Sequence, residues 1–135
     1  MTNKEIVKTW FAAIDAKDFN TLKKLTDTKH KFRNSLTPSP VAADEHIGMI
    51  QNMTSALEGK HTLNLIFGDD DHVAVSGKWS GKHVGEFNGV PATGNQVEFY
   101  FVDLFNIVNG KVVNEHLEMN PLTIMQQIGG VPVNA

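Results

Sequence analysis

The chain contains no cysteine. This absence excludes disulfide bonds, metal sites built on thiolates and catalysis by a cysteine nucleophile. Disulfides are typical of oxidising compartments, so a chain without cysteine suits a reducing one. Residues 1–8 also lack the apolar core of a signal peptide. We therefore expect a cytoplasmic protein.

Positive charge is also scarce. Arg33 is the only arginine, and 12 lysines and arginines stand against 15 acidic residues, which gives a net charge of −3 at pH 7. Nucleic-acid-binding surfaces are basic, and arginine is the usual bidentate partner of phosphate. Long apolar runs that could span a bilayer are missing as well. We expect neither a nucleic-acid partner nor a membrane-embedded segment.

The 135 residues are enough for one domain with its own hydrophobic core, so we expect a single domain over residues 1–135. Helical signals fill its first part. Thr2-Asn3-Lys4-Glu5 forms a capping box, and apolar residues at helical spacing continue to about Lys17. Asp18 is a suitable cap for a second helix. Loose alternation over residues 29–36 indicates a short strand.

A third helix is expected over residues 43–57, with Gly59 at its C-terminal cap. Alternating segments bounded by turn signals then predict four strands and a short terminal helix. The strands lie over residues 62–67, 72–79, 96–108 and 111–120, and the helix over residues 122–128. Helices followed by an antiparallel meander make an α+β fold, with three N-terminal helices packed on a curved antiparallel sheet. Such packing leaves a pocket between the layers, where small ligands usually bind.

Glycine is concentrated between Gly77 and Gly94. Dense glycine among valine, phenylalanine and tryptophan predicts a strand that bends and then breaks into a loop over residues 89–94. His83 and Glu86 are the ionisable side chains that this bend could direct into a cavity. The simpler interpretation, which this stretch alone favours, is that both are solvated residues of an edge strand.

Asn109-Gly110 is the strongest hairpin signal in the chain, and a two-residue turn there fixes the register of its strands. In that register Asp103 lies opposite His116. A carboxylate beside an imidazole can fix its tautomer and raise its basicity, as a general base requires. A cross-strand pair that merely satisfies two polar groups explains the pattern equally well, and a one-residue slip would separate the two side chains. The face with this pair carries Phe99, Phe101, Asp103, Phe105, His116, Glu118 and Asn120.

The other face of the hairpin is largely apolar and carries Tyr100, Val102, Leu104, Val113, Glu115, Leu117 and Met119. Either it is the core, or it is an exposed sheet back that buries itself against a partner. We expect a homodimer through its apolar members, which are Tyr100, Val102, Leu104, Leu117 and Met119.

Four further histidines stand alone in the sequence, at positions 30, 46, 61 and 72. They lack the spacing of metal ligands, so we interpret His30, His46, His61 and His72 as surface or structural residues and expect no metal.

Three motifs follow one another in the last part of the chain. They are Gly-Lys-His-Val-Gly-Glu-Phe-Asn-Gly-Val-Pro-Ala-Thr-Gly over residues 81–94, Val-Asp-Leu-Phe with Asn-Gly-Lys-Val-Val over residues 102–113, and Met-Gln-Gln-Ile-Gly over residues 125–129. In this order they resemble motifs of the SnoaL-like polyketide cyclases and related ester cyclases. The resemblance implies a nuclear transport factor 2-like cone, usually dimeric, and cofactor-free intramolecular aldol cyclisation of a polyketide ester.

The chain departs from this family over the return strand, from Glu115 to Pro121. In the polyketide cyclases an aspartate near the end of the return strand is the proposed acid–base, and counting back from Gln126-Gln127 places this position on Asn120. Asparagine can donate a hydrogen bond but cannot shuttle a proton.

Two functions therefore remain open. The first is a cofactor-independent cyclase, isomerase or lyase acting on a small apolar carbonyl compound, with His116, Asp103 and Glu118 as acid–base residues. His83 and Asn120 would orient the carbonyl. The apolar part of the substrate would contact Trp10, Trp79, Phe99, Phe101 and Phe105. The second is a non-catalytic protein that binds an apolar ligand in the same pocket. Contact between Asp103 and His116 inside the cavity would favour the enzyme, and exposure of both to solvent would favour the binding protein.

Overall fold

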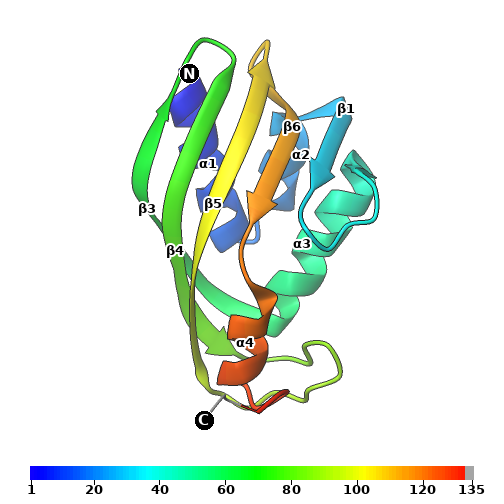
Figure 1. Ribbon diagram of the computed structural model, residues 1–135. Coiled ribbons are helices and arrows are strands. Elements are labelled where there is room, and N and C mark those ends of the chain that lie inside the picture. Colours follow the sequence, from blue (N-terminus) through cyan, green and yellow to red (C-terminus); the bar gives the residue numbers. More distant parts are fainter. Residues whose placement is uncertain (133–135) are drawn as a thin grey trace.

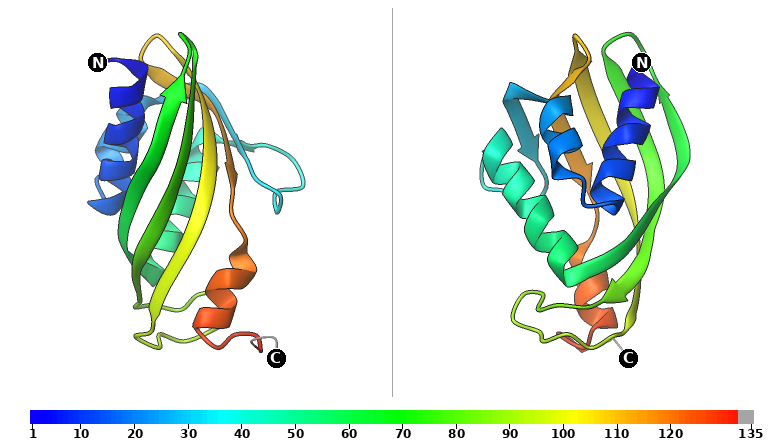
Figure 2. Two further views of the ribbon diagram at one scale, coloured as in Figure 1. Left: turned by 60° about the vertical axis from the view of Figure 1, so that its left-hand side comes forward. Right: turned by 180° about the vertical axis from the view of Figure 1, so that it is seen from behind.

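The computed structural model describes residues 1–132 and places three helices on one face of a curved six-stranded sheet and a fourth helix at one end of it (Figure 1). The left view of Figure 2 shows this layering with the sheet nearly edge-on. The helices are α1 (Asn3–Asp15), α2 (Phe19–Leu25), α3 (Ala43–Ala56) and α4 (Pro121–Gln127). No helix among the described residues is both long and apolar enough to cross a membrane.

The first two helices begin where the capping residues predict. The Thr2 hydroxyl accepts a hydrogen bond from the Glu5 N–H at the start of α1, and the Asp18 carboxylate accepts one from the Thr21 N–H at the start of α2. These bonds satisfy backbone donors that have no partner inside the helix. Helix α1 then turns its buried face, which includes Trp10, towards the sheet.

The strands are β1 (Thr26–Arg33), β2 (Val41–Ala42), β3 (Leu57–Gly68), β4 (His72–His83), β5 (Gln96–Val108) and β6 (Lys111–Glu118). Their order across the sheet is β2-β1-β6-β5-β4-β3. Strand β1 runs parallel to β6, whereas all the other neighbours are antiparallel. The sheet is therefore mixed and mostly antiparallel. The exception arises because β1 and β6 are far apart in the chain and no hairpin joins them.

Strand β3 starts directly after α3, so Gly59 lies inside the strand and does not cap the helix. Gly59 is paired with Gly81 of β4. A Cβ at either position would overlap the backbone of the opposite strand and the Trp79 ring. Glycine is needed here because the two strands and the indole approach one another closely, which is a tertiary contact that local sequence does not reveal.

The hairpin between β5 and β6 has the predicted turn but not the predicted register. Asn109 and Gly110 have φ values of 52° and 75°, as a two-residue turn with a left-handed backbone requires, and Val108 pairs with Lys111. Beyond the turn, Ile107 pairs with Val112 whereas Asn106 pairs with Asn114, so Val113 is an extra residue in β6. This is a β-bulge, and it reverses the face of every later side chain in β6.

The bulge overturns the predicted contact between Asp103 and His116. Asp103 pairs with Leu117, and His116 pairs with Leu104 on the outer face of the sheet. Glu115 pairs with Phe105 and is buried on the inner face, where the sequence pattern had placed His116.

Gly77 offers a test of how tightly the inner face is packed. A Cβ at this position would lie 2.5 Å from the Thr62 carbonyl oxygen and 2.8 Å from the Phe101 ring. We expect Gly77→Ala to lower the free energy of unfolding by about 1–3 kcal/mol, as overpacking usually does. Gly48→Ala in α3 is the control, because a Cβ at Gly48 would have no neighbouring atom within 4 Å. It should raise stability by about 0.5–1 kcal/mol in the same urea titration. Equal changes in the free energy of unfolding for the two variants would contradict close packing around Gly77.

Candidate active site

A cavity of about 270 Å³ lies between the helices and the inner face of the sheet. Its walls are mainly aromatic and aliphatic, and they come from α1, α3, α4, β1, β3, β5 and β6 and from the loop after β1. Trp10, Phe11, Phe99 and Phe101 are among the aromatic residues that line it. Three methionines, Met49, Met53 and Met119, also line it. Such a cavity suits a compact, largely apolar ligand.

Two carboxyl groups interrupt the apolar wall. Asp103 projects from β5 and Glu115 from β6, and they are only 1% and 4% exposed. Both oxygens of Asp103 and Oε1 of Glu115 lack a hydrogen-bond partner among residues 1–132. Two ionised carboxylates cannot bond to each other because each is only an acceptor, so a proton on one of them is required for a hydrogen bond.

This environment favours the protonated forms. Burial raises the pKa of Asp103 well above its usual value, and the negative charge of Glu115 raises it further. Burial also raises the pKa of Glu115 to about 7, although the neighbouring Asp103 carboxyl acts in the opposite direction. The pair therefore retains at least one proton near neutral pH.

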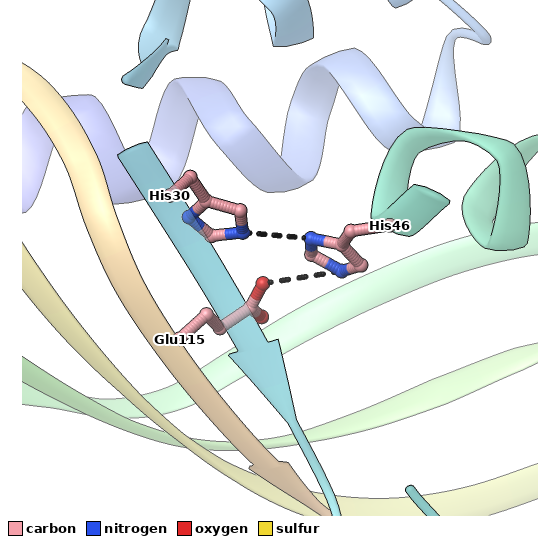
Figure 3. Close-up of side chains that lie close together, drawn as sticks. All are labelled: His30, His46 and Glu115. Atoms are coloured by element: carbon pink, nitrogen blue, oxygen red, sulfur yellow. Dashed lines mark hydrogen bonds and ion pairs between the residues drawn. The ribbon is translucent and has the colours of Figure 1, made fainter. Parts of the chain in front are cut away.

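Two histidines continue from Glu115 into the core, as Figure 3 shows. His46 Nε2 lies 3.5 Å from Glu115 Oε1, and His46 Nδ1 lies 2.9 Å from His30 Nε2. Phe32 stacks on His46 with ring centroids 3.9 Å apart. Trp10 packs against both imidazoles, with centroid distances of 6.1 Å. The two rings are thus held between aromatic side chains.

Both imidazoles are neutral at neutral pH. Burial lowers the pKa of His46 to about 3, with the neighbouring His30 as the second cause. Burial likewise lowers the pKa of His30. In one arrangement of protons, His46 Nδ1–H donates to His30 Nε2, which leaves His46 Nε2 as an acceptor that faces Glu115 Oε1 at 3.5 Å. A proton on Glu115 keeps these two atoms from facing each other as two acceptors.

The same three residues could hold a divalent cation. One donor atom from each of His30, His46 and Glu115 lies within 4.8 Å of the others. His30 and His46, interpreted from the sequence as surface or structural residues, are both buried, and β1 and α3 bring them together. A cation would have to replace the hydrogen bond that joins the two imidazoles.

His116 and Glu118 lie away from this buried group. His116 Nε2 lies 2.8 Å from Glu118 Oε2 at the partly exposed end of β6. Ser35 also donates its hydroxyl and backbone N–H to Glu118. These hydrogen bonds, with that of Ser35 the largest, lower the pKa of Glu118. Glu118 still borders the cavity, whereas His116 borders a broader hollow on the outer face of the sheet.

Asn120 and His83 have structural contacts. The Asn120 side chain accepts a hydrogen bond of 3.0 Å from the Leu122 N–H and so caps α4. His83 is fully buried, and its Nδ1 lies 2.9 Å from the Thr93 hydroxyl. It is therefore not a solvated edge residue. Neither Asn120 nor His83 is among the residues that line the cavity.

The predicted substrate-binding aromatics divide into two groups. Trp10, Phe99 and Phe101 line the cavity. Trp79 stacks on Phe99 at 5.5 Å, and Phe105 packs edge-on against Trp10 at 6.0 Å, so both support the wall from behind.

Comparison with known proteins is consistent with this architecture. The family model for SnoaL-like polyketide cyclase matches residues 4–128. No curated protein gave a match. Among solved structures, AclR from Streptomyces galilaeus is 22% identical with a TM-score of 0.88, over 98% of this chain and 83% of AclR. IdmH from Streptomyces antibioticus is 21% identical with a TM-score of 0.81, over 93% of this chain and 96% of IdmH.

A third similar structure is a SnoaL-like polyketide cyclase from Agrobacterium tumefaciens. It is 14% identical with a TM-score of 0.77, and the match covers 96% of this chain and 99% of that protein. Identities this low show a shared fold, and the chemistry must be argued from the cavity itself.

The buried proton of Glu115 has a consequence for stability. Its pKa is about 7 in the folded protein against 4.5 for an ordinary glutamate. Between pH 4.5 and about pH 7, Glu115 is mostly ionised in the unfolded chain but still protonated in the folded protein. Raising the pH through this range therefore favours the unfolded chain and lowers the stability of the protein. We expect the stability of Glu115→Gln relative to the wild-type protein to increase by about 3 kcal/mol from pH 4.5 to pH 8.

Urea titrations of both proteins at each pH measure this difference. His46 also changes stability with pH, in the opposite direction, but it is present in both proteins and so cancels in the difference. The lowered pKa of His46 makes both proteins more stable as pH rises from about 3 to 6.5. A stability difference between the two proteins that does not depend on pH would show that Glu115 ionises normally.

Proposed function

Because the chain belongs to the SnoaL-like polyketide cyclase family, we propose that it is a cofactor-independent enzyme of the cyclase, isomerase or lyase type. It would perform acid–base chemistry on a small carbonyl compound such as a polyketide-like ester. The observation that carries this proposal is the pair of buried carboxyl groups, Asp103 and Glu115, in an otherwise apolar cavity.

The carboxyl pair is suited to protonating a carbonyl oxygen. A carboxylic acid that keeps its proton near neutral pH can donate it to an oxygen on which negative charge develops. The surrounding apolar wall excludes water and so strengthens this interaction. In this proposal the acid role that the family assigns to the position of Asn120 passes to Asp103 and Glu115, because Asn120 caps α4.

The cavity also limits the substrate. A volume of about 270 Å³ admits a compact molecule of one or two fused rings, or an open chain of similar size. An anionic group beside Asp103 and Glu115 would meet like charge, so the part that reaches them should be neutral. The methionines Met49, Met53 and Met119 have adaptable side chains, which suits substrates of varied outline.

Binding without turnover is the second candidate. It is favoured by the amide at Asn120, which leaves the family's acid position without a titrating group. The two candidates differ in one property, which is whether a bound ketone exchanges its α-protons faster than in buffer.

We expect the protein to accelerate exchange of the α-protons of 2-tetralone in deuterium oxide, followed by proton NMR. Asp103→Asn and Glu115→Gln should each slow this exchange by about 100-fold or more, because each removes a member of the proton-donating pair. Glu98→Gln is the matched control, since Glu98 is an exposed carboxylate that contacts Ser80 and Lys78. Binding of 2-tetralone without faster exchange would identify a binding protein.

We also propose that a second copy of the chain covers the outer face of the sheet. Leu117 and Met119 are not part of this face, because the bulge turns Leu117 towards the cavity and Met119 also lines it. The most exposed apolar side chains that remain on β3 and β5 are Leu65, Phe67, Tyr100, Val102 and Leu104, at 52–76% exposure. Burying them is favourable by roughly 25 cal/mol per Å² of apolar area, before the costs of association.

Light scattering after size exclusion tests this proposal. We expect a dimer at micromolar concentration and a monomer for Leu104→Asp, because a charge in the interface would be buried without a partner. Leu36→Asp is the control: Leu36 is also exposed, but it lies in the loop after β1. A monomeric wild-type protein would contradict a stable dimer.

A further inference from the structure

A second carboxylate–imidazole contact lies at another position along the same cavity. His61 of β3 lines the cavity, and its Nδ1 is 2.6 Å from Oδ1 of Asp15, the last residue of α1. The His61 backbone N–H donates to the other oxygen of Asp15 at 2.9 Å. The right view of Figure 2 shows α1 and β3 side by side, which is why residues far apart in the sequence meet here.

Asp15 occupies an unusual position for an acid. The C-terminal end of a helix carries partial negative charge, which disfavours a carboxylate, and the last turn of α1 has no basic residue. The side chain is also only 17% exposed. Its two contacts with His61 satisfy both oxygens, so Asp15 is held in one orientation.

The contact with Asp15 fixes the tautomer of His61. An ionised carboxylate can only accept, so Nδ1 carries the hydrogen and Nε2 keeps its lone pair when the ring is neutral. No hydrogen bond reaches Nε2 from any residue between 1 and 132. The acceptor nitrogen is thus free to act on a ligand.

Aromatic side chains hold the imidazole in place. Phe11 packs against it with ring centroids 4.8 Å apart, and Phe101 approaches edge-on at 5.5 Å. Phe11 and Phe101 line the cavity as well, and the His61 side chain is only 8% exposed. His61 therefore combines a fixed ring, an oriented lone pair and an apolar surrounding, which are the requirements of a general base.

We propose that His61, oriented by Asp15, is the base that removes a proton from the carbon next to the substrate's carbonyl group. This inference rests on the proposed function, in which Asp103 and Glu115 protonate the oxygen. Nε2 takes the proton, the C–H electron pair becomes the C=C bond of an enol, and the carbonyl π electrons bond to the proton that the carboxyl pair gives up. The imidazolium and the new carboxylate then hold equal and opposite charges until the protons return.

The arrangement defines a substrate class. Acid and base come from different strands of the sheet, with His61 on β3 and the carboxyl pair on β5 and β6. The substrate should therefore be a neutral ketone or β-keto ester whose acidic C–H faces α1 and β3 while its oxygen faces β5 and β6. Such a molecule loses and regains protons without any other reactant.

The base can be tested separately from the acid with 5-nitrobenzisoxazole. In this probe a base removes the C–H proton, the C–N bond becomes a nitrile, and the N–O bond breaks to release a coloured cyanophenolate. No proton donor is required. We expect the wild-type protein to accelerate this elimination, and His61→Gln to lower kcat/KM by about 100-fold.

His72→Gln is the matched control. His72 also contacts an aspartate, with Nδ1 3.1 Å from Oδ1 of Asp69, but both side chains are exposed and lie outside the cavity. Its rate should equal that of the wild-type protein. A wild-type rate no faster than buffer, or an unchanged rate in His61→Gln, would overturn the proposal.

Asp15→Asn tests the positioning role. We expect kcat to fall by about 10-fold while KM stays the same, because the apolar wall still binds the probe but the ring is no longer held. In the unaltered protein, nitrogen-15 NMR of the imidazole should show His61 protonated at Nδ1 when the ring is neutral. Protonation at Nε2 instead would overturn the proposal without any variant.

The outcomes separate this inference from the proposed function. Elimination that depends on His61, without exchange of 2-tetralone, would leave the base in place and refute the proposed carbonyl chemistry. Exchange of 2-tetralone that survives His61→Gln would retain the carbonyl chemistry and refute His61 as its base.

Discussion

The feature on which the site depends is the burial of two carboxyl groups next to each other. Asp103 and Glu115 have almost no contact with water, and neither can satisfy the other while both are ionised. A retained proton resolves this conflict and provides a proton donor near neutral pH. Such burial is costly to stability, and proteins commonly keep costly groups where they act on a ligand. The rest of the cavity wall is apolar, so it preserves the condition that raises both pKa values.

The fold brings this pair together through one irregularity. The extra residue at Val113 turns Glu115 inward and His116 outward, whereas a regular hairpin would do the opposite. Helix α3 and strand β1 then place His46 and His30 behind Glu115, and α1 places Asp15 against His61 on β3. The cavity thus receives polar groups from both layers, and both His46 and His61 are held by a hydrogen bond to a second residue.

Much of the fold could be predicted from local sequence signals. The caps at Thr2 and Asp18, the turn at Asn109-Gly110 and the strand over residues 96–108 depend on residues close together in the chain, and each was predicted correctly. The site could not be predicted in the same way. Val113 carries no local signal of a bulge, and His30, His46 and His61 meet their partners only through tertiary packing. One clue was available: Glu115 was the only charged side chain on a hairpin face that otherwise looked apolar.

The ionisation of Asp103 and Glu115 is the property that most directly tests this account. It can be followed by carbon-13 NMR of the side-chain carboxyl carbons across a pH titration of the unaltered protein. Of the 15 acidic side chains, we expect those of Asp103 and Glu115 to stay protonated after the others have ionised, with Glu115 titrating near pH 7. Complete ionisation of both groups by pH 5 would contradict the account, because the cavity would then hold no proton donor at neutral pH.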